Sequence, residues 1–267
     1  MPFDVLIAGG GIAGPCLAFW LTRRSHSVTI IEQARQLRTG GQAVDFRGAS
    51  LVVLEKMGLL PQVRASATRM GPLVLVDERG REIGRLPTEV ISGELEIYWG
   101  DLARILYEAV RDSADYRFGV RVTSLDDDGD RVNVTFSDAS TGSYDVVIGA
   151  DGLHSGVRGM VFGPEEQYVT QLGQCFGFFD IENRLRIDHC GMACAARPTT
   201  QRRYRAAAHT RCQQARRPAV ADCRTLLHVA ELLSRYTVAA PWRPAPPAKR
   251  PAPSIASAAT REMLANS

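Results

Sequence analysis

The hydrophobic pattern of the first 32 residues predicts a strand, a turn, a helix and a second strand. Residues 4–8 form a short apolar run that ends at a cluster of glycines. Apolar side chains then recur at helical spacing over residues 15–24, and a β-branched run over residues 27–32 ends in an acidic residue. Alternation of strands with helices is typical of an α/β fold.

Beyond residue 40, the chain continues to alternate between amphipathic helical runs and short β-type runs. The predicted elements cover residues 49–57, 72–77, 82–86, 100–111, 120–125, 131–136 and 144–148, and a further strand is predicted at residues 175–181. The acidic run at residues 126–130 separates two of these strands and has the composition of a calcium loop. No Glu follows it at the distance that a calcium loop needs, so we interpret it as a solvated hairpin turn.

Charge and glycine content change abruptly near residue 189. Residues 1–188 carry 19 Lys and Arg against 26 Asp and Glu, whereas residues 189–267 carry 13 against 3. Of the 24 glycines, only Gly191 lies in the second part, which is rich in Arg, Ala, Pro and Cys. Because a GC-rich gene read out of frame yields such residues, we hypothesise a frameshift near His189. We expect residues 189–267 to be an atypical, poorly ordered tail with one helix at residues 226–236.

The size and the apolar content of the chain limit the classes of protein to which it can belong. A chain of 267 residues with 45% hydrophobic content can bury a substantial core in one or two domains. No apolar run approaches the length of about 20 residues that spans a bilayer, and the first apolar stretch lacks a basic leader, so we expect a cytoplasmic protein without a membrane partner. The six cysteines do not define a disulfide framework.

Three glycines in the first turn suit the binding of a dinucleotide. Gly9 allows a tight turn, Gly11 lets the backbone approach a pyrophosphate, and Gly14 lets the helix pack closely on the strand. Ile12 and Ala13 lie at the start of the helix, where unpaired N–H groups and the positive dipole end would face the phosphates. A glycine-rich turn without a ligand is the alternative, but the flanking strand and helix favour a dinucleotide site.

Glu32 closes this unit at the end of the second strand. It lies about 20 residues beyond the glycines, where a carboxylate can accept hydrogen bonds from ribose hydroxyls. A carboxylate there disfavours a 2′-phosphate, so the adenosine of FAD or NAD suits the site better than that of NADP. The motif alone does not separate FAD from NAD.

The next glycine-rich segment carries a resemblance to a known family. The run Gly40-Gly41-Gln42-Ala43-Val44-Asp45, with Gly48 and an amphipathic helix after it, resembles the para-hydroxybenzoate hydroxylase group of flavoprotein monooxygenases. Within that group it is most similar to the branch that contains tetracycline-inactivating enzymes and hydroxylases of aromatic polyketides. The resemblance implies that Gly41, Gln42 and Asp45 contact FAD, and it argues against an NAD-dependent oxidoreductase.

A second, more specific motif follows the predicted strand at residues 144–148. Asp151, Gly152, Ser155 and Arg158 match the D-G motif of the family, which lies near the pyrophosphate and influences nicotinamide binding. The resemblance therefore implies that these four residues belong to the cofactor site. The alternatives are that Asp151 only caps a helix and that Arg158 is a surface cation.

The resemblance implies a fold and a division into domains. It extends from Val5 to about Ile181 and indicates a Rossmann-like FAD-binding domain with an inserted β-sheet substrate domain, incomplete at the C-terminus. Residues 1–70 and 98–165 would form the FAD-binding domain, and residues 71–97 and 166–188 would form part of the substrate sheet.

The resemblance also implies a reaction. Family members use NAD(P)H to reduce the flavin, and the reduced flavin reacts with molecular oxygen to give a C4a-hydroperoxide that hydroxylates an aromatic or polyketide-like small molecule. Tetracycline-type antibiotics are candidate substrates, which would make the protein a resistance factor. Because the cofactor carries this chemistry, we expect no catalytic triad and no acid–base role for His26 or His154.

Two departures from the family affect the expected flavin site. Trp99 stands where family members usually carry an arginine that reaches the flavin, and Gln33 stands where relatives often carry arginine after the ribose-binding acid. We still include Gln33 among the cofactor-binding residues. The nearby cations that could compensate are Arg35, Arg38 and Arg47, each of which is by default a surface charge.

The last third of the chain lacks a further motif that the family supplies. Residues 189–267 contain no Gly-Asp-Ala sequence, whose aspartate binds the ribityl chain in the family. The alternative to a working monooxygenase is therefore a truncated, inactive FAD-binding fragment. We expect no metal site and no specific nucleic-acid binding, because the spacing of the Cys and His residues in the tail matches no zinc motif and its arginines lack a recognisable module. The zinc set that we reject is Cys190, Cys194, His209, Cys212 and Cys223.

Overall fold

The computed structural model of the chain describes residues 1–77, 79–170, 189–194 and 206–208, all of which lie within one compact unit, Met1–Ser234. The predicted strand at residues 175–181, the predicted helix at residues 226–236 and most of the expected poorly ordered tail lie outside these residues.

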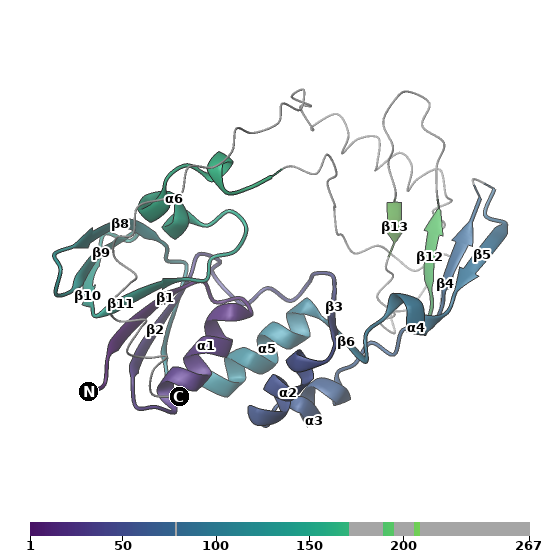
Figure 1. The fold of residues 1–267 in the computed structure, drawn as a ribbon, viewed down its shortest axis with the longest axis horizontal. Coiled ribbons are helices and arrows are strands. Elements are labelled where there is room, and N and C mark those ends of the chain that lie inside the picture. The colour runs from purple at the N-terminus through teal and green to yellow at the C-terminus, as the bar shows by residue number, and fades with distance from the viewer. Residues whose placement is uncertain (78, 171–188, 195–205, 209–267) are drawn as a thin grey trace. The chain divides into compact units, whose positions relative to one another are not determined.

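A four-stranded parallel sheet, ordered β11-β1-β2-β7, forms the centre of the N-terminal fold (Figure 1). The chain leaves β1, passes through the glycine-rich turn and helix α1, and returns as β2 beside β1. The α/β class predicted from the hydrophobic pattern is confirmed. The strands of this sheet are β1 (Asp4–Ala8), β2 (Ser27–Glu32), β7 (Asp115–Phe118) and β11 (Val146–Gly149).

Helices cover one face of the parallel sheet. Val5 and Ile7 of β1 belong to a hydrophobic cluster with Ala18 of α1 and Leu106 of α5. Within the described ranges, every helix is too short or too polar to cross a lipid bilayer. The helices are α1 (Ala13–Thr22), α2 (Ala49–Lys56), α3 (Leu60–Ala65), α4 (Thr88–Ile91), α5 (Trp99–Val110), α6 (Gly156–Phe162) and the 3-10 helix η1 (Glu165–Gln167).

A three-stranded antiparallel sheet covers the other face. Leu6 and Ala8 of β1 pack in a second cluster with Val134 and Phe136 of this sheet and with Val157 of α6. Successive side chains of β1 therefore bury both faces of the strand, as is usual in a parallel sheet. The strands of the three-stranded sheet are β8 (Val122–Asp127), β9 (Val132–Phe136) and β10 (Thr141–Tyr144), in the order β10-β9-β8.

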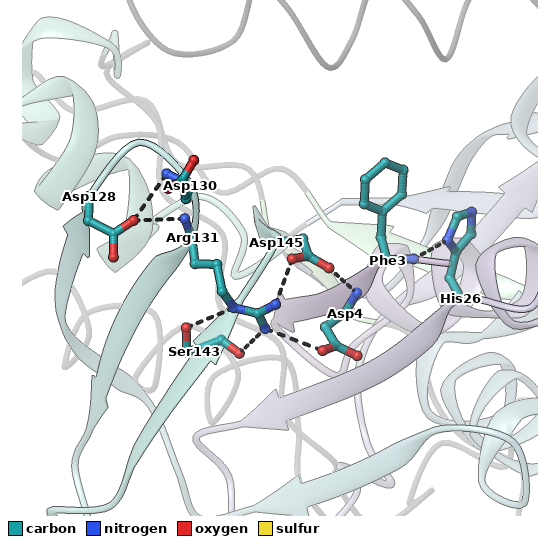
Figure 2. Close-up of polar contacts among 8 residues, drawn as sticks. All are labelled: Phe3, Asp4, His26, Asp128, Asp130, Arg131, Ser143 and Asp145. Atoms are coloured by element: carbon teal, nitrogen blue, oxygen red, sulfur yellow. Dashed lines mark hydrogen bonds and ion pairs between the residues drawn. The ribbon is translucent and has the colours of Figure 1, made fainter. Parts of the chain in front are cut away.

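An arginine-centred cluster fastens this antiparallel sheet to the start of β1 (Figure 2). The Arg131 guanidinium donates to Asp145 Oδ1 at 2.8 Å and to Asp4 Oδ2 at 3.3 Å. It also donates to the hydroxyl and the carbonyl of Ser143, at 3.0 and 2.7 Å. Because Arg131 is partly exposed, each ion pair contributes at most about 1 kcal/mol, and the cluster chiefly fixes the relative placement of β9, β10 and β1.

The acidic run at residues 126–130 completes β8 with Asp126 and Asp127 and then forms the turn to β9, so the predicted hairpin is confirmed and its first strand ends two residues later than expected. Asp128 Oδ1 accepts hydrogen bonds from the backbone N–H groups of Asp130 and Arg131, at 3.0 and 2.9 Å (Figure 2). Its other oxygen accepts from the Asn133 amide at 3.0 Å. These hydrogen bonds, those from the backbone first, hold the pKa of the Asp128 carboxyl below its usual value.

Two further sheets lie in the middle of the chain. β3 (Ala43–Phe46) pairs antiparallel with β6 (Leu95–Tyr98). The other sheet has the order β13-β12-β4-β5, in which β12 pairs parallel with β4. Residues 191–194, which lie just beyond the change in composition at residue 189, thus pair with a strand near residue 75. The strands of this second sheet are β4 (Leu73–Val76), β5 (Glu82–Leu86), β12 (Gly191–Cys194) and β13 (Ala206–Ala208).

The predicted strand at residues 144–148 is wrong in one respect. β10 ends at Tyr144 and β11 begins at Val146, and the two strands belong to different sheets. Asp145 lies at the change, where its N–H donates to the Asp4 carbonyl at 2.9 Å and its side chain accepts from the Asp4 N–H at 2.7 Å. One predicted strand can therefore contain a switch between two sheets.

Candidate functional site

The glycine-rich turn between β1 and α1 is shaped by close backbone contacts. Gly9 has a φ of +117°, and a Cβ atom added there would overlap the carbonyl group of Ala150. A Cβ atom added to Gly14 would overlap the carbonyl oxygen of Gly9. Only glycine fits at these two positions, so the turn is compact and lies directly beside the chain that leaves β11.

The Gly10 peptide group is held from both sides. Its N–H donates to Glu32 Oε2 at 2.9 Å, and its carbonyl accepts a hydrogen bond from the Tyr116 hydroxyl at 2.5 Å. Glu32 Oε1 accepts from the Ala34 N–H at 2.8 Å. Each carboxylate oxygen can accept a second hydrogen bond, so Glu32 retains the capacity to bind ribose hydroxyls at the end of β2.

Tyr116 is a residue of this site that the sequence did not indicate. Burial of the phenol, followed by the negative charge of Glu32 and by the neighbouring Tyr107, raises the pKa of Tyr116 well above its usual value. The ring stacks on Phe118 at a centroid distance of 4.7 Å and meets Tyr107 edge-on at 5.0 Å. The alternation of Tyr116 and Phe118 in a short run after a helix was the only available signal.

The N-terminus of α1 opens directly from the turn. Ile12 is its N-cap and makes no side-chain capping hydrogen bond, and the Cys16 N–H is bonded to the Ile12 carbonyl at 3.2 Å. The earlier N–H groups of Ala13 and Gly14 precede the first intrahelical hydrogen bond. Such groups at the positive end of a ten-residue helix form a favourable setting for an anion.

The Gly40–Asp45 segment reaches this turn through Trp99. Gly41 has a φ of +132°, and the Gln42 carbonyl accepts a hydrogen bond from the Trp99 N–H at 2.9 Å. Asp45 is exposed, and its Oδ1 accepts from the Gly93 N–H at 3.0 Å. The Trp99 side chain lies beside both Gly41 and Gly11, so the Gly41 backbone lies near the turn. The Asp45 side chain, in contrast, is bonded to the loop before β6.

The D-G turn lies beside the first turn. The Ala150 N–H donates to the Ala8 carbonyl at 2.7 Å, next to the close contact between Ala150 and Gly9. Gly152 has a φ of +86°, and nothing lies within 4 Å of a Cβ atom added to it. The structure thus brings Gly9, Gly152 and their neighbours to the same end of the parallel sheet.

Side-chain hydrogen bonds shape the D-G turn. Asp151 Oδ1 accepts from the Ser155 hydroxyl at 2.5 Å, and Oδ2 accepts from the Val157 N–H at 3.1 Å. Ser155 is the N-cap of α6, and its hydroxyl oxygen accepts from the Arg158 N–H at 3.0 Å. Asp151 therefore has the capping role that we considered as the alternative to cofactor contact, and Ser155 caps the same helix.

Arg158 is anchored within the same turn. Its Nη2 donates to the Leu153 carbonyl at 2.7 Å and to Glu165 Oε2 at 3.1 Å. His154 Nδ1 lies 2.9 Å from the other oxygen of Glu165. Within the described residues, Arg158 Nε is buried without a hydrogen-bond partner. Arg158 is thus neither a free surface cation nor fully satisfied.

Gln33 and the three arginines expected to compensate for the missing cations are spread over the surface. Gln33 is exposed beyond Glu32, and Arg47 is exposed at the end of β3. Arg35 and Arg38 help to line an open hollow of about 560 Å³ formed by residues 34–39. None of these side chains makes a hydrogen bond to the glycine-rich turn in the described structure.

The rejected zinc set cannot be examined as a whole, because His209, Cys212 and Cys223 lie outside the described residues. Among the residues that are described, no three His, Cys, Asp or Glu side chains converge as metal ligands.

Comparison with known proteins gives one family and several relatives. The sequence profile of a family described as FAD binding domain matches residues 2–167. An uncharacterized protein of Mycobacterium tuberculosis, MT1298, is 44% identical over 191 residues, which cover 69% of this chain and 51% of that protein. The FAD-dependent monooxygenase asL4 of Sarocladium schorii is 40% identical over 199 residues, which cover 71% of this chain and 46% of that protein.

The fold is also similar to solved structures. The crystal structure of tetracycline destructase Tet(51) matches with a TM-score of 0.64 and 33% identity, covering 74% of this chain and 51% of that one. Tetracycline destructase Tet(55) matches with a TM-score of 0.63 and the same identity. The chain spans about half the length of the curated relatives it matches.

Proposed function

The chain belongs to the family of FAD binding domains, and from this membership we propose that the turn between β1 and α1, Glu32 and the D-G turn hold FAD. The observation that carries the proposal is the Glu32 carboxylate at the end of β2, bonded to the Gly10 N–H and still able to accept two more hydrogen bonds. A carboxylate at this point suits an adenosine ribose and disfavours a 2′-phosphate.

The residues of the two turns fit the remaining parts of such a dinucleotide. Gly11 has no side chain where the backbone would approach a pyrophosphate, and the N–H groups of Ile12, Ala13 and Gly14 at the start of α1 would stabilise its negative charge. We assign Gly41, Gln42, Asp45 and Gln33 to the outer part of the same site. Asp151 and Ser155 act indirectly, because their hydrogen bonds set the shape of the D-G turn.

We further propose that the chain is part of an NAD(P)H-driven monooxygenase that acts with molecular oxygen on an aromatic or polyketide-like small molecule. Its likeness to tetracycline destructases and to an FAD-dependent monooxygenase of Sarocladium schorii supports this reaction class. Tetracycline-type antibiotics are the first substrates to test, and their inactivation would confer resistance. A bound flavin supplies the electron transfer and oxygen chemistry, while the chain binds and orients it.

One alternative has its own supporting observation. The sequence of residues 189–267 contains a single glycine and no Gly-Asp pair, so the motif that binds the ribityl chain in the family is missing from it. The alternative function is therefore FAD binding without turnover.

The visible absorption spectrum after incubation with FAD and removal of free cofactor tests the proposal. We expect flavin at near-stoichiometric occupancy in the chain, and binding weakened about tenfold or more in Glu32→Ala, because hydrogen bonds to a charged group contribute about 1.5–3 kcal/mol each. Glu55→Ala, an exposed acid on α2, is the matched control and should bind as the parent does. Folded protein that retains no flavin would contradict the proposal.

Turnover separates the two functional alternatives. Oxidation of NADPH or NADH under oxygen, with loss of tetracycline or of a model phenol, supports the monooxygenase. Bound flavin that is never reduced by either nicotinamide supports FAD binding without turnover.

A further inference from the structure

The Trp99 side chain lies between the two glycine-rich segments of the site. A Cβ atom added to Gly11 would lie 3.3 Å from Cζ2 and 3.8 Å from Cη2 of the Trp99 indole. A Cβ atom added to Gly41 would lie 3.1 Å from Trp99 Cβ and 3.6 Å from Cγ. The six-membered ring of the indole therefore points toward Gly11, and its base lies against Gly41.

The backbone of Trp99 is fixed, whereas its side chain is only half-buried. Its N–H is bonded to the Gln42 carbonyl, and the preceding residue, Tyr98, pairs with Ala43 in the β3–β6 sheet. The next residue, Gly100, is buried so closely on the Thr39 backbone that a Cβ atom would overlap it. Any movement of the indole must therefore be a rotation of the side chain about a fixed start of α5.

The indole occupies the space through which the backbone of a dinucleotide-binding turn approaches the pyrophosphate. The second glycine of such a turn has no side chain because the backbone must approach the pyrophosphate there. A Cβ atom at Gly11 would point into that approach, and the nearest atoms along it are carbons of the Trp99 ring. The indole is also uncharged, so it offers a phosphate no ionic attraction.

From this juxtaposition we infer that Trp99 determines the affinity of the chain for its dinucleotide by covering Gly11 until the indole rotates away. The inference rests on the proposed FAD site and adds to it a residue that opposes binding. The apparent affinity falls by the fraction of molecules whose indole is rotated away. A fraction of about one-tenth would weaken binding about tenfold.

Titration of the full chain with FAD tests the inference through affinity. Trp99→Ala should bind FAD about tenfold more tightly than the parent, and Trp99→Phe, which lacks the ring atoms nearest Gly11, should fall between them. Trp20→Phe, a substitution on α1 at a side chain that packs edge-on to Phe19, is the matched control and should bind as the parent does. Circular dichroism spectra establish that each variant is folded.

A second readout follows the indole itself. The sequence contains three tryptophans, so the variant Trp20→Phe/Trp242→Phe reports on Trp99 alone. ADP-ribose carries the pyrophosphate but no flavin, so it does not quench indole emission through a flavin ring. Its binding should shift the Trp99 emission to longer wavelength as the ring enters water.

The outcomes distinguish this inference from the proposed function. Equal or weaker FAD binding by folded Trp99→Ala, or an emission maximum that ADP-ribose leaves unchanged while it binds, would show that Trp99 is a wall of the site and would overturn the inference alone. If the parent and all Trp99 variants are folded and none binds FAD or ADP-ribose, the proposed site fails and the inference fails with it.

Discussion

Two glycine-containing turns meet at one end of the parallel sheet, and they are built in different ways. The turn after β1 requires residues without side chains, because a Cβ atom at Gly9 or Gly14 would overlap a backbone carbonyl. The turn after β11 is specified by side chains, because Asp151 and Ser155 bond to each other and to the start of α6. Only glycine can maintain the first turn, whereas the second is a network that can lose one member and keep its shape.

The difference also shows which of the two turns is better suited to contact a cofactor and which has side chains that mainly maintain its own shape. In the first turn, the features that suit a cofactor are bare backbone and helix N–H groups, with Glu32 as the one charged side chain. In the second turn, Asp151 and Ser155 bond within the turn and to the start of α6, and Arg158 bonds to the Leu153 carbonyl and to Glu165. We therefore expect substitutions in the first turn to affect folding and FAD binding together, and substitutions in the second to act first on stability.

Gly14→Ala should break the first turn and have the largest effect. Its new Cβ atom meets the Gly9 carbonyl oxygen, which belongs to the backbone and cannot move aside cheaply, so we expect a loss of about 3 kcal/mol in the free energy of unfolding. Urea unfolding followed by circular dichroism measures it. Gly159→Ala on α6, where nothing lies within 4 Å of the added atom, should remain within about 1 kcal/mol of the parent. A loss below 1 kcal/mol in Gly14→Ala would refute this account of the turn.

Asp151→Ala should weaken the second turn without abolishing it. The substitution removes two hydrogen bonds but leaves the Ser155 cap in place, so we expect a loss of about 1–2 kcal/mol. The double variant with Ser155→Ala should cost less than the two single losses together, because the residues share one network. Asp126→Ala, at an exposed position near the end of β8, serves as the control. Strict additivity in the same unfolding assay would argue against a network.

Tyr116→Phe tests how far a side chain also supports the first turn, because the Tyr116 hydroxyl donates a hydrogen bond to the Gly10 carbonyl there. We expect a loss of about 1 kcal/mol at neutral pH from the missing hydrogen bond to Gly10. The raised pKa of Tyr116 adds a pH dependence: above pH 10 the unfolded chain loses the phenol proton while the folded chain keeps it, so stability falls as pH rises.

The pH dependence is measured by urea unfolding at pH 8 and pH 11 in parallel. The parent should lose more stability than Tyr116→Phe over this range, and Tyr168→Phe, which removes an exposed hydroxyl bonded to the Phe162 carbonyl, should retain the parental slope. Identical slopes in the parent and Tyr116→Phe would exclude Tyr116 as the responsible group.

The sequence allowed the local part of the site to be predicted, and the structure added contacts between distant segments. The order of β1, α1 and β2 follows from apolar periodicity and from glycines close together in the chain. Short strands such as β3 and β7 were missed, because four residues of mixed polarity give no period. The hydrogen bond from Tyr116 to Gly10 joins residues 106 positions apart, which no local pattern reveals.

Trp99 illustrates the same limit at a single side chain. Its position at the start of a helix was predictable from the sequence. A tryptophan at this position also indicated that the arginine usual in the family is missing. Its contact with Gly11 was not predictable, because it depends on how the β3–β6 pair places the start of α5 beside the glycine-rich turn.

The position of β1 between β2 and β11 has a consequence for how the chain folds during synthesis. β2 follows β1 closely, but the segment that supplies β11 begins just after Asp145, which lies 141 residues beyond Asp4. At ribosomal rates of about 5–20 residues per second, roughly seven to thirty seconds pass before that partner emerges. During this interval one edge of an apolar strand stays unpaired, so the nascent protein is most exposed to misassociation before its sheet can close.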